Sequence, residues 1–325
     1  MTELTNVIPS VPADELAPAN ELADALVASV QTTVRGKDEV VRLAVVALLA
    51  GGHLLLEDLP GTGKTLLAKS LAASLGGRFG RVQCTPDLLP SDITGTSVYM
   101  PGDGSWTFRP GPLFANVLLV DEINRASPRT QAALLEPMEE QQVSVDGTTH
   151  LLPDPFFCIA TQNPFGQVGT FPLPESQLDR FALVISMGLP DRAAEREILT
   201  GSGGANVFDD LRAITTPAEV AAAISAVQSV YVAPALVEYV LDLAAASRRH
   251  PELSVGASPR ASVGLLRAAR AHAVVDGRGH ATPDDVQAVV HASFAHRVAV
   301  GGTVNTESAR RILADLVDGT PVPRP

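Results

Sequence analysis

The stretch covering residues 53–75 constrains the fold of this chain more than any other part of the sequence. A short apolar run at 53–57 leads into Asp58-Leu-Pro-Gly61-Thr-Gly63-Lys64-Thr65, and a helical pattern continues over 66–75. A glycine-rich turn at the start of a helix directs several backbone N–H groups to one point, where the helix dipole also attracts an anion. The order of strand, turn and helix therefore predicts a phosphate-binding loop.

Individual residues of this turn have separate roles in such a loop. We expect Lys64 to reach the β- and γ-phosphates of a nucleotide, and the Thr65 hydroxyl to hold Mg²⁺. Asp58 stands where the first glycine of these loops is usual, so we expect its carboxylate to point away from the triphosphate. The residues expected to bind the nucleotide in this loop are Pro60, Gly61, Thr62, Gly63, Lys64, Thr65 and Leu66.

A second apolar run ends in two acids, in Val117-Leu-Leu-Val-Asp121-Glu122. We expect Asp121 to hold the water shell of Mg²⁺, and Glu122 to orient and deprotonate the attacking water. Taken alone, acids after a strand also fit a helix cap. Together with the phosphate-binding loop, the pair favours nucleotide hydrolysis. The guanine-reading pattern Asn-Lys-x-Asp is absent, so the expected nucleotide is ATP rather than GTP.

Asn163 follows another apolar run, in Ile-Ala-Thr-Gln-Asn163-Pro164. Ligands of open α/β sheets bind at the carboxyl ends of the strands, so we expect Asn163 to touch the γ-phosphate or to align the water. The simpler interpretation is that Asn-Pro starts a turn.

Two arginines extend the candidate site. Arg180 precedes the last apolar run, at a position that faces the neighbouring subunit in ring-forming ATPases, where a cation stabilises the transferring phosphoryl group. Its alternative is a surface ion pair with Asp179 or Asp191. Arg260 lies in the first turn of a helix that begins at Ser258-Pro259, where the helix dipole disfavours a cation unless an anion such as a nucleotide is near. Its alternative is a solvated side chain.

Five short apolar runs predict the strands of the core. They are nearly continuous rather than alternating, as expected for parallel strands that are buried on both faces, and helical patterns separate most of them. This arrangement predicts an α/β fold. The five runs cover residues 53–57, 79–83, 116–120, 156–161 and 181–186.

The composition changes near Pro190, beyond which the chain is rich in alanine and helical in pattern. Thr216-Pro and Thr282-Pro both place a capping threonine before proline at the first helical position. We expect a flexible N-terminal arm over 1–19, an αβα nucleotide-binding core over 20–190, an all-helical domain over 191–318 and a Pro-rich tail over 319–325.

Composition limits the class of protein. The 325 residues carry a net charge of −12, which disfavours general nucleic-acid binding. The longest apolar run, 43–50, is far shorter than the ~20 residues that span a bilayer. We therefore expect a soluble, cytoplasmic protein without a membrane span, and no zinc site, because no His-Glu-x-x-His occurs and the two cysteines lie far apart.

Residues 99–108 are centred on Gly102-Asp-Gly104 and predict a β-hairpin with a projecting tip. Trp106 in this hairpin either packs locally or belongs to a surface that touches a client protein.

The combination of these motifs resembles the AAA+ ATPases, and within them the MoxR family, over residues 34–297. Gly166 and Val168 depart from the family pattern, because acids are common at both positions. The likeness rests on four long segments: Gly111-Pro-Leu-Phe-Ala-Asn-Val-Leu-Leu-Val-Asp-Glu-Ile-Asn-Arg-Ala126, Gln131-Ala-Ala-Leu-Leu-Glu-Pro-Met-Glu-Glu140, Gly169-Thr-Phe-Pro-Leu-Pro-Glu-Ser-Gln-Leu-Asp-Arg-Phe181 and Gly256-Ala-Ser-Pro-Arg-Ala261.

The resemblance implies a five-stranded αβα AAA+ core followed by a helical lid, with ATP and Mg²⁺ bound where the two meet, and a homo-hexameric ring. It implies that the adenine lies near Val34 and Gly36. It also implies a chaperone-like role on client proteins, often metal-dependent enzymes, together with partners that carry a von Willebrand factor A domain. The implied site residues are Lys64 and Thr65 of Walker A, Asp121 and Glu122 of Walker B, Asn163 as sensor 1, Arg180 as arginine finger and Arg260 as sensor 2.

The sequence therefore predicts an ATP-hydrolysing molecular machine. Two alternatives stay open: a nucleotide-gated binding scaffold with little hydrolysis, and an AAA+ protein that acts on DNA. The intact Asp121-Glu122 pair disfavours the scaffold, and the lack of an added helix-turn-helix or zinc module disfavours action on DNA.

Overall fold

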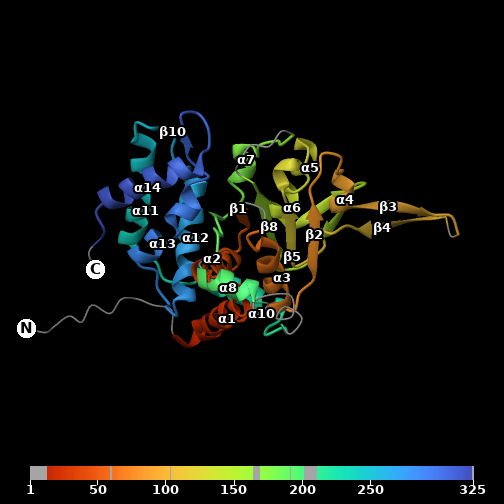
Figure 1. The fold of residues 1–325 in the computed structure, drawn as a ribbon, viewed down its shortest axis with the longest axis horizontal. Coiled ribbons are helices and arrows are strands. Elements are labelled where there is room, and N and C mark those ends of the chain that lie inside the picture. The colour runs from red at the N-terminus through yellow and green to blue at the C-terminus, as the bar shows by residue number, and fades with distance from the viewer. Residues whose placement is uncertain are drawn as a thin grey trace, which may run out of the picture. The chain divides into compact units, whose positions relative to one another are not determined.

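The computed structural model describes residues 13–58, 61–102, 104–163, 169–190, 192–200 and 211–323 (Figure 1). Contacts divide the chain into two compact units. We call Ala25–Ala221 the core unit, and Ala222–Pro325 together with Met1–Asp24 the helical unit. Each is described by itself.

A five-stranded parallel sheet forms the centre of the core unit, in the order β2-β5-β8-β1-β9. The predicted α/β core is thereby confirmed, and each strand falls within two residues of its predicted run. The strands are β1 (Leu54–Glu57), β2 (Phe79–Gln83), β5 (Val117–Asp121), β8 (Phe157–Gln162) and β9 (Leu183–Ile185).

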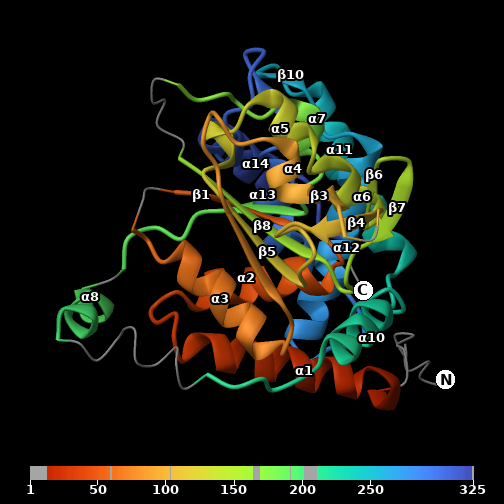
Figure 2. The same cartoon turned by 90° about the vertical axis from the view of Figure 1, so that its right-hand side faces the viewer.

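Helices cover both faces of this sheet (Figure 2). On one face lie α2 (Asp38–Leu49) and α3 (Lys64–Ser74), and on the other lie α5 (Pro128–Ala132), α6 (Leu135–Glu140) and α7 (Glu175–Leu178). The strands can therefore be apolar throughout, and every residue of β5 is buried. Because all five strands are parallel, their carboxyl ends share one edge of the sheet.

The predicted N-terminal arm over 1–19 is wrong for its last residues, because helix α1 spans Ala13–Gln31 and includes Pro18. Proline in a helix interior removes one backbone hydrogen bond. Pro18 is exposed, however, while Leu16 and Ala19 are buried, and this burial offsets the lost bond. The arm's residues 1–12 lie outside the described part of the chain, as do residues 324–325 of the tail.

The boundary expected at residue 190 differs from the division by contacts, which falls between Ala221 and Ala222. Helix α8 (Arg192–Leu199) and the segment after residue 210 stay with the core unit. The Ile214 backbone N–H donates to the Ser74 carbonyl at the end of α3, at 3.0 Å. This bond holds the segment against the core before helix α10 (Pro217–Val227) crosses the division.

Four helices make up most of the helical unit: α11 (Pro234–Arg249), α12 (Pro259–Val275), α13 (Pro283–Phe294) and α14 (Thr306–Gly319). The predicted starts of α12 and α13 are confirmed by their caps. Ser258 Oγ accepts from the Ala261 N–H at 3.1 Å, and Thr282 forms a reciprocal capping box with Asp285. A small antiparallel sheet of β10 (Leu253–Val255) and β11 (Ala299–Val300) adds strands where only helices were expected.

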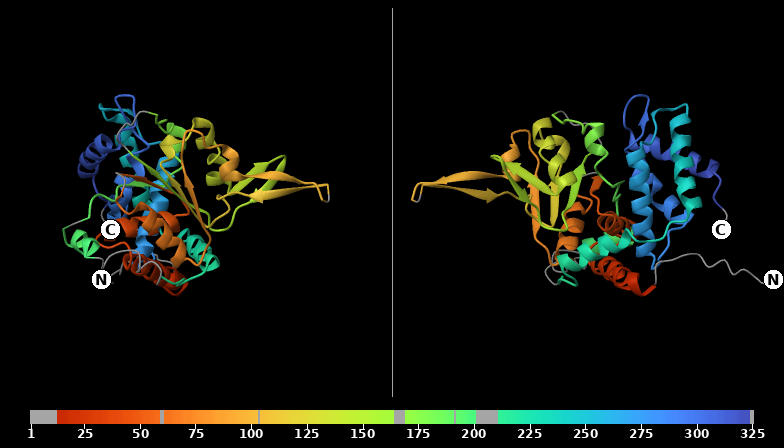
Figure 3. Two further views of the ribbon diagram at one scale, coloured as in Figure 1. Left: turned by 45° about the vertical axis from the view of Figure 1, so that its right-hand side comes forward. Right: turned by 180° about the vertical axis from the view of Figure 1, so that it is seen from behind.

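Two hairpins extend the core unit. The predicted one is confirmed and longer than expected: β3 (Gly95–Met100) pairs with β4 (Ser105–Pro110) and projects from the core (Figure 3). Gly95 has φ +94°, and a Cβ there would lie 2.3 Å from the Arg109 carbonyl, so only glycine fits at its base. The second hairpin, β6 (Gln142–Val145) with β7 (Thr148–Leu151), was not predicted.

The helices in the described ranges all fall short of the combined length and apolarity that a membrane span requires.

Candidate nucleotide-binding site

A pocket of about 440 Å³ opens at the carboxyl edge of the sheet. It unites the residues predicted from four separate places in the sequence, namely the loop before α3 and the ends of β5, β8 and β1. Its lining residues are Asp58, Gly61, Gly63, Lys64, Thr65, Leu66, Arg81, Gln83, Asp121, Glu122, Thr161, Gln162 and Asn163.

The loop before α3 has the backbone that a phosphate-binding turn needs. Gly61 (φ +86°) and Gly63 (φ +94°) both adopt left-handed conformations, which glycine reaches without strain. Gly63 is the residue before the helix, so the first backbone N–H groups of α3 lie at the pocket, where they could bind an anion. Leu59 and Pro60, a predicted contact, lie outside the described residues.

Lys64 begins α3 and turns its ammonium back over the loop, where Nζ donates to the Asp58 carbonyl at 3.0 Å. Burial lowers the pKa of Lys64 below its ordinary value, and three nearby carboxylates oppose that shift. A bound phosphate would replace this neutral carbonyl with an anionic acceptor, which makes a stronger hydrogen bond to an ammonium.

Asp58, the residue in place of the usual glycine, ties the loop to the chain that follows β9. Its Oδ2 accepts from the Gly188 N–H at 2.6 Å and from the Ser186 hydroxyl at 3.2 Å. These bonds give the carboxylate partners outside the phosphate loop, and they account for a carboxylate at this position.

Asp121, the last residue of β5, is held from two sides. Arg81 Nε and Nη2 donate to its Oδ2 at 2.9 and 2.8 Å, and the Thr161 hydroxyl donates to its Oδ1 at 3.4 Å. With Thr65 also lining the pocket, the donor set contains a carboxylate and a hydroxyl. Oxygen ligands of this kind are those that Mg²⁺ prefers, so the residues present fit the expected metal.

Glu122 has an unusual backbone, with φ 55° and ψ 49°. A left-handed residue other than glycine costs about 1–3 kcal/mol, and such residues cluster at functional sites. The Glu122 N–H donates to Thr161 Oγ1 at 2.8 Å, which stabilises this conformation. Its carboxylate lies 3.3 Å from Arg125 Nε, so the predicted base forms an ion pair within its own chain.

Asn163 lines the same pocket directly after β8. Its carbonyl accepts from Asn124 Nδ2 at 3.3 Å, which links the end of β8 to the turn after β5. Gly166 and Val168, the departures from the family pattern, lie outside the described residues.

Arg180 lies outside the residues that line this pocket, and among the described residues its ion pair is with a glutamate. Its Nη2 lies 2.8 Å from Glu139 Oε2, and its Nη1 donates to the Ser176 carbonyl. Asp191, one of the two aspartates named as alternatives, lies outside the described residues. The structure therefore places the predicted arginine finger in an ion pair with the end of α6.

A second pocket, of about 110 Å³, shares Gly61, Gly63 and Leu66 with the first. Val34 lines it, with apolar and basic neighbours from the start of α2 and the chain after β9. Gly36, the other residue predicted near the adenine, is outside its lining and has φ +67° in the turn between α1 and α2. The two pockets thus form a continuous surface around the phosphate loop.

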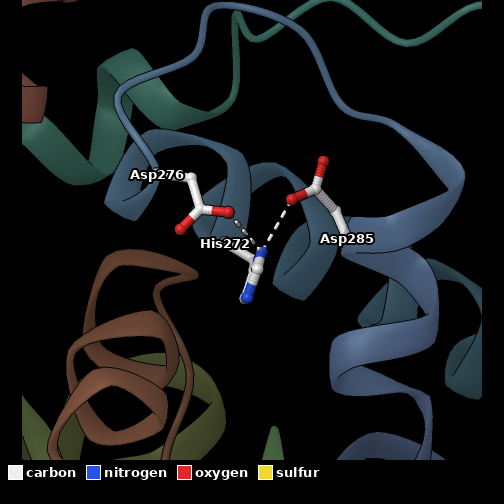
Figure 4. Close-up of side chains that lie close together, drawn as sticks. All are labelled: His272, Asp276 and Asp285. Carbon is white, nitrogen blue, oxygen red and sulfur yellow. Dashed lines mark hydrogen bonds and ion pairs between the residues drawn. The ribbon is translucent and has the colours of Figure 1, made fainter. Parts of the chain in front are cut away.

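Arg260 belongs to the helical unit and lies in the first turn of α12, as predicted. Its side chain is exposed in this unit. The same unit holds a cluster of His272, Asp276 and Asp285 (Figure 4). His272 Nδ1 lies 2.6 Å from Asp285 Oδ1, and Arg278 donates to both Asp285 oxygens at 2.6 Å. Because a guanidinium already neutralises the buried carboxylate, we interpret the cluster as a salt-bridged helix cap.

Sequence reasoning missed Arg81, Gln83, Arg125 and Thr161. Each is polar and near the end of a strand, but β2 becomes the neighbour of β5 only in the folded sheet. The alternation in β2, with Gly80 and Val82 buried and Arg81 and Gln83 exposed, is the signal that was present.

Comparison with known proteins agrees with this geometry. Residues 53–183 match the model of the ATPase family associated with various cellular activities (AAA), and residues 245–316 match that of the AAA lid domain. The uncharacterized protein YeaC of Bacillus subtilis is 42% identical over 290 residues, which are 89% of this chain and 91% of YeaC. Chaperone MoxR1 of Mycobacterium tuberculosis is 40% identical over 308 residues, which are 89% of this chain and 81% of MoxR1.

A solved structure is similar as well. The crystal structure of a candidate ATPase from Cytophaga hutchinsonii has a TM-score of 0.86 and 32% sequence identity, and the match covers 96% of this chain and 98% of that chain. The fold, the two matched family models and a relative named for MoxR together identify this chain as a member of the MoxR family of AAA+ ATPases.

Proposed function

We propose that this chain hydrolyses ATP with Mg²⁺ and uses the cycle to remodel or activate a client protein or protein complex. The observation that carries the proposal is the single pocket that gathers Lys64 and Thr65 with Asp121, Glu122 and Asn163. Phosphoryl transfer needs charge neutralisation and a positioned water more than it needs covalent chemistry, and this set of side chains supplies both.

Each residue has a role in this proposal. Lys64 neutralises phosphate oxygens, while Thr65 and Asp121 would hold Mg²⁺, which would supply positive charge to the bound phosphates. Glu122 takes a proton from the attacking water, and Asn163 aligns that water or touches the γ-phosphate. The Glu122 carboxylate must leave Arg125, 3.3 Å away, before it can accept that proton.

The second pocket supports a location for the base of the nucleotide. Val34 gives it an apolar wall, and the shared residues Gly61 and Gly63 connect it to the phosphate loop. We infer that the adenine lies there, with Gly36 shaping the turn that closes the pocket.

We further propose a homo-hexameric ring in which Arg180 of one subunit completes the site of the next. Arg180 is paired with Glu139 in its own chain, so assembly would exchange this ion pair for the charge of a bound nucleotide. Arg260 would couple the nucleotide state to the helical lid. The name of the relative MoxR1 supports a chaperone role, and we extend the proposal to partners with a von Willebrand factor A domain.

ATP turnover per subunit, measured as a function of protein concentration, tests the proposal, with Glu122→Gln as the control. We expect specific activity to rise with concentration, because the active site is shared between subunits, and the control to be inactive. Turnover equal to that of the control at every concentration, despite nucleotide binding, would favour a nucleotide-gated scaffold. Stimulation by DNA at modest salt would instead favour action on nucleic acid.

A further inference from the structure

Arg81 is placed by the pairing of two strands. It lies on the exposed face of β2, two residues before Gln83, which stands opposite Asp121 on β5. Its side chain therefore extends along the strand to the carboxyl edge of the sheet. There Nε and Nη2 both donate to Asp121 Oδ2, at 2.9 and 2.8 Å, and Nη2 also reaches Gln83 Oε1 at 3.5 Å.

The pair has an electrostatic consequence. The Asp121 side chain is 9% exposed, and a carboxylate so removed from water is unfavourable without a countercharge. Lys64 contributes part of this countercharge, because Asp121 is among the carboxylates that act on its ammonium, although its Nζ hydrogen bond goes to the Asp58 carbonyl. Arg81, whose side chain is 47% exposed, contacts the Asp121 carboxylate directly from the solvent side of the pocket.

Mg²⁺ and Arg81 are therefore expected to compete for one carboxylate. In the proposed function the same Asp121 that Arg81 binds holds the metal. Two cations on one buried carboxylate repel each other, so each weakens the binding of the other. Arg81 also adds positive charge to a pocket whose charged lining residues are Asp58, Lys64, Arg81, Asp121 and Glu122, and this charge attracts a nucleotide that carries no metal.

We propose that Arg81 is a positioning residue that holds Asp121 while metal is absent and sets the Mg²⁺ concentration at which the site changes from metal-free to metal-bound nucleotide. This role rests on the proposed ATP site. It makes two predictions of opposite sign. Without Arg81, metal-free nucleotide binds more weakly, whereas less Mg²⁺ is needed to reach the metal-bound state.

The test is equilibrium binding of a fluorescent ADP analogue, which is not hydrolysed, in EDTA and over a Mg²⁺ titration. The variants are Arg81→Gln, which removes the charge, and Arg81→Lys, which keeps the charge but loses the two-donor fork. Arg78→Gln is the matched control, because Arg78 is exposed, directly precedes β2 and lies outside the pocket lining. It carries the same loss of one positive charge.

We expect Arg81→Gln to weaken binding in EDTA by about tenfold and to lower the Mg²⁺ midpoint by about fivefold, as for loss of a charge-assisted contact. Arg81→Lys should retain most of the EDTA affinity while its midpoint falls, and Arg78→Gln should match wild type in both measurements. If Arg81→Gln does not fold, the fall in midpoint of Arg81→Lys carries the test.

An equal loss of affinity with and without Mg²⁺, at an unchanged midpoint, would show that Arg81 only supports the structure and would overturn the proposal. A wild-type chain that binds no nucleotide in either buffer would instead refute the proposed function itself.

Discussion

Arg180 and Glu139 form an ion pair, with Nη2 2.8 Å from Oε2, that joins the segment before β9 to the end of α6. The arginine is mostly buried, and its Nη1 also donates to the Ser176 carbonyl. An arginine held in this way has a fixed direction in the free subunit. In the proposed ring it would have to leave Glu139 before it could reach the nucleotide of the neighbouring subunit.

Mixing two inactive variants tests this trans role. Arg180→Ala retains Glu122 but lacks the proposed arginine finger, and Glu122→Gln retains that arginine but lacks the proposed base. In the proposed ring, mixed assemblies would contain some interfaces with both groups intact, so we expect turnover to reappear on mixing, up to about a quarter of wild type for random assembly at equal amounts. ATP hydrolysis of the mixture is the measurement. Two variants that stay inactive together, although they co-assemble, would place Arg180 in its own subunit's site.

Lys64 and Glu122 should separate binding from hydrolysis. Lys64→Ala removes the ammonium that faces the phosphate position, so we expect nucleotide affinity to fall at least about tenfold. Glu122→Gln preserves the size and the hydrogen-bonding oxygen of the side chain but cannot accept a proton, so binding should persist while turnover falls at least about a hundredfold. Isothermal titration and a phosphate-release assay read the two effects. Normal hydrolysis by Glu122→Gln would refute its assignment as base.

Much of the site could be predicted because its main residues follow one another within short motifs. Gly61 to Thr65 carry their own geometry, and Asp121-Glu122 ends an apolar strand. Two contacts could not be predicted from such motifs: that of Arg81 with Asp121 and that of Arg180 with Glu139. Each joins residues about 40 positions apart, which the strand order or the helix packing brings together. Local sequence contains no information on that order.

The missed β6–β7 hairpin is different, because its signal was present. Asp146 (φ 51°) and Gly147 (φ 78°) form a two-residue turn between strands, and Asp-Gly is a strong sequence indicator of such turns. The long start of α1 was missed for the opposite reason. Proline disfavours a helix interior, but the burial of Leu16 and Ala19 beside Pro18 outweighs that local preference.

His53 predicts a pH dependence of core stability. Burial lowers the pKa of His53 to about 4, and its Nδ1 accepts from the Cys158 N–H at 3.1 Å. The unfolded chain has an ordinary imidazole with a pKa of about 6.5, so it binds more protons than the folded chain at mildly acidic pH. Stability should therefore fall by about 2 kcal/mol between about pH 7.5 and about pH 5.

Urea unfolding of the full chain at several pH values, followed by a probe in the core unit, gives the slope of the free energy of unfolding against pH. His53→Gln should remove most of the slope between about pH 6.5 and about pH 4, whatever its stability at pH 7.5. His150→Gln, on β7, is the control and should keep it. An unchanged slope in His53→Gln would mean that another group titrates in this range.

The β3–β4 hairpin carries a tryptophan whose fluorescence should report an exposed side chain. Trp106 is the single tryptophan of the chain and is 70% exposed, although its ring centroid lies 5.4 Å from that of Tyr99 on the paired strand. We expect red-shifted emission and ready quenching by iodide in the free chain. Trp106→Ala should change the stability of the core by less than about 0.5 kcal/mol. Emission shielded from iodide in the free subunit would show that the ring packs locally.

Asp285 should make the stability of the helical unit depend on pH. This dependence lies at lower pH than the one that His53 gives to the core unit. Burial alone would raise the pKa of Asp285, but hydrogen bonds from Arg278, His272 and Thr282 outweigh it and hold the pKa well below its usual range. The folded carboxylate therefore stays ionised where the unfolded one is protonated. Its contribution is complete above about pH 4 and is lost as the pH falls below that value.

Asp285→Asn keeps the shape of the cap but leaves Arg278 without its buried partner, so we expect a loss of about 3 kcal/mol at neutral pH. Asp284→Asn, the exposed neighbour in the same helical turn, is the matched control and should cost less than about 0.5 kcal/mol. Thermal unfolding of the full chain at pH 7 and in acid reads both variants, and the difference between wild type and Asp285→Asn should shrink in acid. If the two substitutions proved equally mild at pH 7, the network around Asp285 would not be what stabilises the start of α13.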